Sequence, residues 1–227
     1  MLRIYRGAGK EYEEDLTGIA PGCRIELAAP DEEELRAVTA ATGLAKSCFQ
    51  LMETGDGCPR VIAGDRRIIA IVEVPVIRDS DRFDTVLLTI VLTPDYLVTA
   101  CKETLSVLPD SEAEDDAFSS RGLSGQFFTI LHRIDRQFLR HIHYIRRRSD
   151  EIEQQLRSSL ENKELFQLLD FEKGLTYFTA ALRANVIVLE SLLRLRADPH
   201  LQRLLETPAA TAADDMLETV IIENKRA

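Results

Sequence analysis

Three of the four histidines of this chain, His132, His141 and His143, lie close together in sequence. Imidazole nitrogens are frequent zinc and iron ligands, so these residues are the first candidates for a metal site. The apolar residues around them recur every three or four positions, which indicates a helix. At about 100° and about 1.5 Å per residue, His132 and His143 share a face about 16 Å apart, and His141 points about 160° away from His143. We therefore expect solvated or interface histidines and no metal ligand.

Two charged clusters flank or overlap this helix. The acidic run 110–116 offers carboxylates of the kind that Mg²⁺ or Ca²⁺ prefers, but it lacks the spacing and glycine of an EF-hand loop, so it is interpreted as a solvated linker. The basic cluster is suited to three anionic partners: the acidic run, a neighbouring subunit or anionic lipid headgroups. Pairing within and between the helices is the default interpretation. The basic cluster contains Arg133, Arg136, Arg140, Arg146, Arg147 and Arg148.

Catalytic motifs are missing from the sequence. Cys23, Cys48, Cys58 and Cys101 have no ligand-like spacing and no histidine near them, which is typical of reduced, mostly buried thiols in a cytoplasmic protein. The sequence contains no G-x-S-x-G, P-loop, G-x-G-x-x-G or H-E-x-x-H motif. We expect no enzyme and no catalytic or cofactor-binding residue; a metal-dependent enzyme is the third hypothesis.

The formal net charge of −10 argues against nucleic-acid binding, which requires a positive surface. A hydrophobic fraction of 45% is ordinary for a globular protein and argues against disorder. The apolar runs are shorter than the roughly 20 residues that span a bilayer. The chain as given is not expected to cross a membrane.

The first part of the chain predicts an α+β fold, an α/β/α sandwich with a mixed, largely antiparallel sheet and helices on both faces. β-Branched runs separated by Gly, Pro and Asp indicate strands, and the almost continuous apolar runs imply that both faces of the sheet are covered. A helix is predicted between Asp31 and Gly43, with acids in its first turn, and a shorter one over 44–53. The predicted strands cover 2–5, 24–28, 61–62, 68–74, 86–92 and 96–101.

The middle of the chain predicts two long helical arms within 120–196. Each arm carries an apolar stripe, and arms of about 35 residues would reach about 50 Å. Folding back on each other would bury both stripes. The first stripe contains Leu123, Phe127, Ile130, Ile134, Phe138, Ile142, Ile145, Ile152, Leu156 and Leu160, and the second contains Leu168, Phe171, Leu175, Phe178, Leu182, Val186, Leu189 and Leu193.

These patterns divide the chain into an α/β sheet domain (1–108), an acidic linker (109–120), long helical arms (121–206) and the start of a stalk helix (207–227). The last segment begins at Asp214 as an amphipathic helix and reaches Ala227 without a stop signal. We therefore expect the natural protein to continue beyond this residue.

The order of elements and several local strings resemble the cytoplasmic amino-terminal domain of CorA-type magnesium/cobalt transporters. The similarity covers nearly the whole chain, and order and spacing make it specific. The strings are RIELAAP (24–30), DEEE (31–34), PRVI (59–62), IAIVEVP (69–75), IVL (90–92), LVTAC (97–101), NKEL (162–165), LL (168–169), LTYF (175–178) and IIENK (221–225).

The resemblance implies a cytosolic regulatory domain at the cytoplasmic face of the cell membrane, which couples subunit packing and intracellular Mg²⁺ to a pentameric pore. The membrane helices and the family's Gly-Met-Asn signature would lie beyond Ala227. No cofactor is required, and Mg²⁺ is the implied regulatory ion between subunits. The family's acidic ligand aligns near Leu51, with Glu53 and Asp56 as the nearest carboxylates, and Arg24 replaces the usual aromatic residue. No metal ligand is therefore assigned. The alternative is a free-standing soluble module whose helices bind a protein partner.

Overall fold

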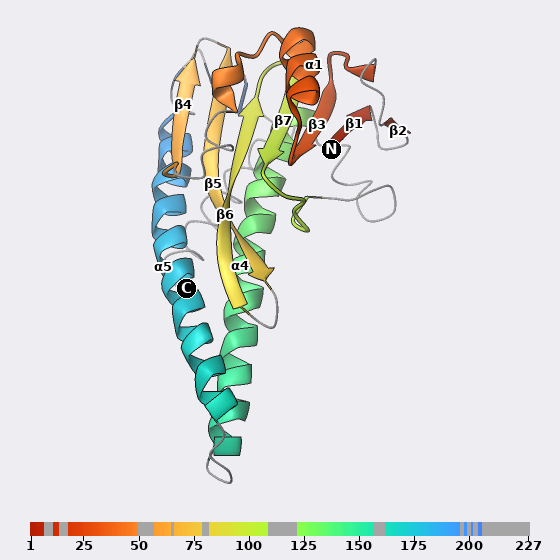
Figure 1. Cartoon of the computed structure of the whole chain (residues 1–227). Coiled ribbons are helices and arrows are strands. Elements are labelled where there is room, and N and C mark those ends of the chain that lie inside the picture. The colour runs from red at the N-terminus through yellow and green to blue at the C-terminus, as the bar shows by residue number, and fades with distance from the viewer. Residues whose placement is uncertain are drawn as a thin grey trace.

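The computed structural model describes residues 1–6, 11–13, 18–49, 57–64, 66–78, 82–108, 122–156, 162–195, 198, 201 and 204–205. These residues form a seven-stranded sheet in the order β2-β1-β3-β7-β6-β5-β4 (Figure 1). Every neighbouring pair is antiparallel except β3 and β7, which are parallel. The predicted mixed, largely antiparallel sheet is thus confirmed. The strands are β1 (Leu2–Arg6), β2 (Glu11–Glu13), β3 (Cys23–Ala28), β4 (Arg60–Gly64), β5 (Arg67–Arg78), β6 (Arg82–Leu92) and β7 (Tyr96–Cys101).

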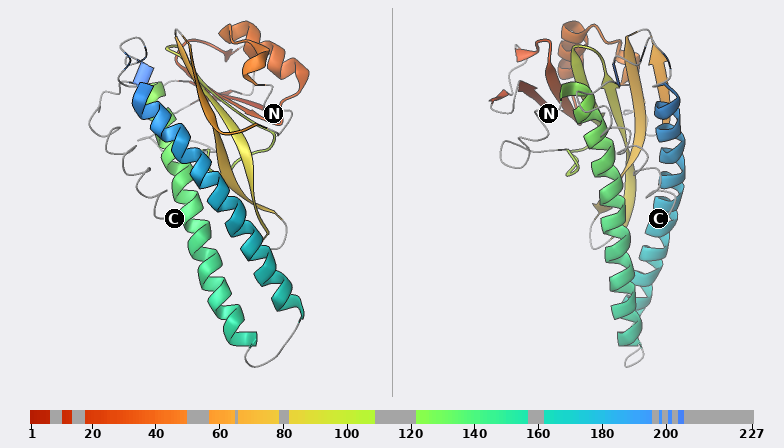
Figure 2. Two further views of the ribbon diagram at one scale, coloured as in Figure 1. Left: turned by 90° about the vertical axis from the view of Figure 1, so that its left-hand side faces the viewer. Right: turned by 180° about the vertical axis from the view of Figure 1, so that it is seen from behind.

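Each face of the sheet has its own apolar core. On one face, alternate residues of β3 such as Ile25 and Leu27 pack with Leu35 and Val38 of helix α1 (Glu32–Thr42). On the other face, β5 and β6 pack against the long helices α4 (Gly122–Leu156) and α5 (Asn162–Leu195). Figure 2 shows the three layers edge-on. The predicted α/β/α sandwich is confirmed, and the near-continuous apolar runs are explained by helices on both sides.

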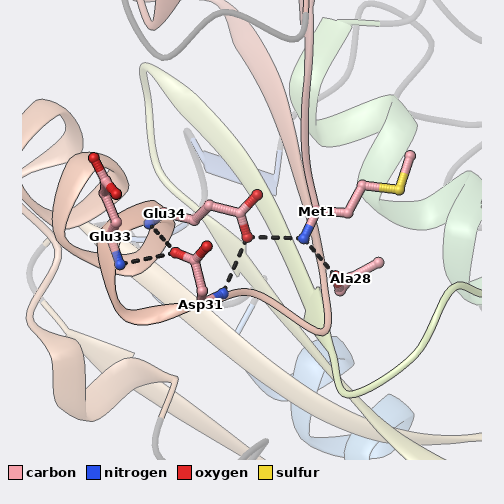
Figure 3. A network of polar contacts seen from close by, with 5 residues as sticks. All are labelled: Met1, Ala28, Asp31, Glu33 and Glu34. Atoms are coloured by element: carbon pink, nitrogen blue, oxygen red, sulfur yellow. Dashed lines mark hydrogen bonds and ion pairs between the residues drawn. The ribbon is translucent and has the colours of Figure 1, made fainter.

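Helix α1 begins and ends where its sequence predicts. The Asp31 carboxylate accepts hydrogen bonds from the backbone N–H groups of Glu33 and Glu34, both at 2.8 Å, and the Glu34 carboxylate accepts one from the Asp31 N–H at 3.1 Å. This capping box satisfies backbone N–H groups at the N-terminus of α1, which have no partner within the helix. The Met1 ammonium group donates to Glu34 and to the Ala28 carbonyl, so the chain start is tied to the cap (Figure 3). Gly43 ends the helix at φ 70°, a left-handed conformation that favours glycine.

The two arms contain 35 and 34 residues, and they project together past the end of the sheet (Figure 2). Their apolar stripes are buried partly on each other, as predicted, and partly against the sheet, because Phe127, Phe138, Phe178 and Leu189 all belong to the core that contains β5 and β6. The prediction is wrong for one residue of the second stripe, because Leu175 is 37% exposed. Its predecessor in sequence, Gly174, is buried in its place.

Two local predictions need correction. The segment Glu11–Glu13 forms the edge strand β2, which was not predicted because three residues are too few to show a period. The predicted helix over 44–53 is a short 3₁₀ helix, Lys46–Cys48, as far as the structure describes it. The end of this predicted helix, the acidic linker, residues 157–161 between the arms and the amphipathic segment after Asp214 lie outside the described residues.

Candidate functional site

The tip of the β5–β6 hairpin inserts an aromatic side chain between the arms. Phe83, near the start of β6, is 3% exposed. Its ring centroid lies 5.6 Å from that of His141 and 6.0 Å from that of Tyr144 on α4, and 6.0 Å from Phe171 and 5.8 Å from Phe178 on α5. Such tilted and edge-on contacts are favourable beyond the area they bury. One sheet residue therefore holds both arms where they leave the sheet.

Gly174 lets α5 approach this side chain closely. A Cβ atom at position 174 would lie 2.7 Å from the Cβ of Phe83, a separation that packed carbon atoms do not tolerate. The arms are also joined directly, because the Phe138 and Phe178 rings meet edge-on at 5.2 Å. Phe83 and its aromatic neighbours, together with Gly174, are called the aromatic joint below. It links the hairpin tip to both arms.

Replacing Gly174 by Ala should destabilise the protein by up to about 2 kcal/mol. Alanine gains about 1 kcal/mol of helix propensity over glycine, but the clash with Phe83 costs about 1–3 kcal/mol. Urea unfolding measures the difference. Ala180 is exposed on the same helix, and Ala180→Gly supplies the propensity reference. A Gly174→Ala variant more stable than the parent would show that α5 is not held against Phe83.

A polar cavity of about 260 Å³ adjoins the aromatic joint; its lining includes Arg78, Glu103, Ser106, Gln137 and His141. The Arg78 guanidinium donates to Glu103 at 2.6 Å, and the Gln137 amide nitrogen lies 3.2 Å from the Ser106 hydroxyl and 3.4 Å from the His141 Nε2. The hydrogen bond to Glu103 raises the pKa of Arg78. The cavity therefore presents fixed polar groups beside an apolar joint.

Burial lowers the pKa of His141 below its usual value, and the neighbouring positive charge of Arg140 lowers it further. In the unfolded chain the imidazole is solvated and has its ordinary pKa of about 6.5. Below that pH the unfolded state binds a proton that the folded state resists, so stability falls as pH falls. Protonation would also place a cation among the rings of the aromatic joint.

We expect the melting temperature to decrease between about pH 7 and pH 5, and His141→Gln to flatten this dependence. His143 is exposed on the same helix, so His143→Gln is the matched control. Thermal unfolding at several pH values measures both variants. An unchanged slope in His141→Gln, or the same flattening in both variants, would exclude His141 as the cause.

Asn185 of α5 closes the open edge of β5. The side chain is 5% exposed; its oxygen accepts from the Glu73 N–H and its nitrogen donates to the Glu73 carbonyl, both at 2.9 Å. Strand β4 pairs with β5 only as far as Ile71. The N–H and carbonyl of Glu73 therefore have no partner in β4. Pro75, two residues on, has no N–H to satisfy. The helix thus replaces a missing strand partner and fixes the level of α5 on the sheet.

A second buried polar cluster lies on β1 and β3. Arg24, 5% exposed, stacks its guanidinium 3.7 Å from the ring centroid of Tyr5. Glu26, 1% exposed, lies 3.8 Å from Arg3. Burial lowers the pKa of Arg24 and raises that of Tyr5. The unusual arginine at the start of β3 therefore has an aromatic partner.

The structure does not bring the predicted candidates together as a metal site. No group of three or more His, Cys, Asp or Glu side chains among the described residues could hold an ion. His143 is exposed, as expected, but His141 belongs to the aromatic joint instead of being solvated or at an interface. Cys58 is exposed and the other three thiols are buried. Leu51, Glu53, Asp56 and the acidic run 110–116 lie outside the described residues.

The basic cluster differs from its default interpretation. Arg148 pairs with Glu151 at 2.7 Å within α4, as expected. Arg136, Arg140, Arg146 and Arg147 are exposed, and within the described ranges they form no ion pair. The prediction of pairing within and between the arms is therefore wrong for these four residues.

The sheet joined to two projecting helices defines a class of α+β domain with long helical arms. The comparisons identify the family. The model of the CorA-like Mg²⁺ transporter protein family matches residues 24–221, and the chain belongs to this family of transporters, which are not enzymes. No curated protein matches the chain.

Solved structures show the same fold. The soluble domain of CorA from Methanocaldococcus jannaschii is 19% identical with a TM-score of 0.78, covering 100% of this chain and 91% of that one. Full-length CmaX is 12% identical with a TM-score of 0.69, covering 99% and 72%. The cytoplasmic domain of ZntB from Vibrio parahaemolyticus RIMD 2210633 is 11% identical with a TM-score of 0.60, covering 99% and 93%. None of the helices described here combines the length and apolarity needed to cross a bilayer.

Proposed function

We propose that this chain is the cytosolic regulatory domain of a CorA-like divalent-cation transporter, on the cytoplasmic face of the cell membrane. In this proposal it couples the packing of subunits and intracellular Mg²⁺ to a membrane pore. The family membership supports transport of Mg²⁺ or Co²⁺ as cargo. The observation that carries the coupling is the aromatic joint, because Phe83 contacts both arms and transmits a displacement of the sheet to them.

Transmission requires elements that move as units. The arms share a core with β5 and β6, and Asn185 fixes α5 along the strand direction. A change at the sheet therefore tilts both helices instead of bending one. Past the sheet the arms contact mainly each other (Figure 2), so a small tilt produces a larger displacement at their far end. The regulatory ion is proposed as Mg²⁺ between subunits of an oligomer, as a pentamer in the intact protein.

The proposal is tested first by the codons that follow residue 227 in the natural gene. We expect them to encode two membrane-spanning helices. An immediate stop codon would contradict the proposal and favour the free-standing interaction module.

Transport by the longer gene product supplies the second test. In proteoliposomes, Phe83→Leu should change the Mg²⁺ concentration on the domain side that half-inhibits Mg²⁺ flux, because it loosens the aromatic joint. Leu175→Ala, on the exposed face of α5, is the control and should leave this concentration unchanged. Flux that does not respond to Mg²⁺ on the domain side would exclude a sensing role.

A further inference from the structure

Three of the four unpaired arginines, together with His143, form an ordered surface on α4. Arg136, Arg140, His143 and Arg147 follow one another at steps of four, three and four residues, which places them along one face of the helix over about 16 Å. All four side chains are exposed. This arginine row lies opposite the buried stripe that includes Phe138 and therefore contributes nothing to the core. An exposed row of like charges without partners costs stability, which suggests an anionic partner outside the described residues.

The start of α5, at the far end of the arms, exposes apolar side chains. Leu165, Phe166 and Leu169, in the first turns of α5, are 44%, 67% and 58% exposed. Lys173 and Tyr177 continue this face, with the ammonium 5.7 Å from the ring centroid. These five residues are called the α5 foot. Exposed Phe and Leu beside Lys and Tyr are typical of surfaces that bind at the boundary between lipid headgroups and acyl chains.

We propose that the arginine row and the α5 foot together bind the surface of an anionic lipid bilayer. Arginine pairs with phosphate in a two-pronged geometry, and the apolar foot enters the headgroup layer. Free phosphate would use the row but leave the foot exposed. Nucleic acid is disfavoured because the rest of the chain is acidic, with a net charge of −10. A second copy of this chain would cover the foot, but it too is acidic overall.

The shape of the molecule makes such a contact feasible. The arms project past the sheet (Figure 1), so their ends can approach a surface while the rest of the acidic chain stays away from it. Charges are screened over about 8 Å at physiological ionic strength. Asp150 and Glu153 are exposed beyond Arg147 and limit the positive stretch, so they should weaken binding. The proposal is independent of Mg²⁺ sensing.

Flotation of the 227-residue protein with vesicles tests the proposal. We expect binding to vesicles of phosphatidylcholine with one quarter phosphatidylglycerol at low salt, and little binding to pure phosphatidylcholine. The variant R136Q/R140Q/R147Q should bind about a hundredfold more weakly, at roughly fivefold for each arginine. F166S/L169S should lose about tenfold or more. D150N/E153Q should bind more tightly.

The control R60Q/R66Q/R67Q removes the same charge from exposed positions on β4, on β5 and in the turn between them and should change binding less than twofold. No binding to anionic vesicles, equal losses in both triple variants, or equal binding to neutral vesicles would overturn the proposal. Sedimentation of the parent chain distinguishes the competing partner: self-association that F166S/L169S abolishes, without vesicle binding, would assign the α5 foot to a second copy.

Discussion

Phe83→Ala lowers the free energy of unfolding by about 3–5 kcal/mol, the usual cost of removing a buried phenylalanine. The side chain is 3% exposed and contacts four rings on two helices. Phe83 is the only aromatic residue of β6, so no other ring of this strand can fill the space. Denaturant unfolding followed by circular dichroism gives the value.

The matched control for this substitution is Phe166→Ala, the same chemical change at a side chain that is 67% exposed. It should alter stability by no more than about 0.5 kcal/mol. A loss of less than about 1 kcal/mol for Phe83→Ala would show that the arms are held by the remaining core without the aromatic joint, and it would remove the main support for coupling through the hairpin.

Asn185→Leu should cost about 2–6 kcal/mol. Leucine has the same branching and the same number of side-chain heavy atoms as asparagine, but it cannot form hydrogen bonds to the N–H and carbonyl of Glu73. Each buried backbone group left unsatisfied costs about 1–3 kcal/mol. The exchange rate of the Glu73 amide hydrogen gives a local measure, and this amide should lose protection more than its neighbours in β5.

Thr179→Leu, on the exposed side of α5, controls for adding leucine to this helix and should be nearly neutral. If the Glu73 amide keeps its protection in Asn185→Leu, another group bonds to it, and Asn185 does not position α5. The thermodynamic loss and the local exchange therefore test separate statements about the same contact.

Much of the fold is predictable from local patterns. The alternation in β3, the apolar runs of β5 and β6, and the stripe of α4 each depend on burial that follows the strand or helix period. Asp31 and Gly43 define α1 because capping uses side chains within a few residues of the helix end. These features need no knowledge of distant contacts.

The candidate site depends on distant contacts and could not be predicted in the same way. Asn185 and Glu73 are 112 residues apart, and an asparagine within an apolar stripe is the only signal of its role. Gly174 is one helical turn before Phe178, which indicates close approach without naming Phe83. The predicted ion pairing of Arg136 and Arg140 was wrong because helical spacing shows which residues share a face of one helix. It does not show whether an acidic side chain lies within reach of them.

The parallel contact of β3 with β7 also has a kinetic consequence. It joins residues such as Cys23 and Tyr96, whereas β4 to β7 pair with near neighbours in sequence. Closing a long loop costs conformational entropy and slows folding. Strands β4 to β7 should therefore assemble first, and the amino-terminal strands should add later. Amide protection in β1 and β3 should therefore appear after protection in β5 and β6 during refolding. The amino-terminal edge of the sheet is then the last part of the domain to form.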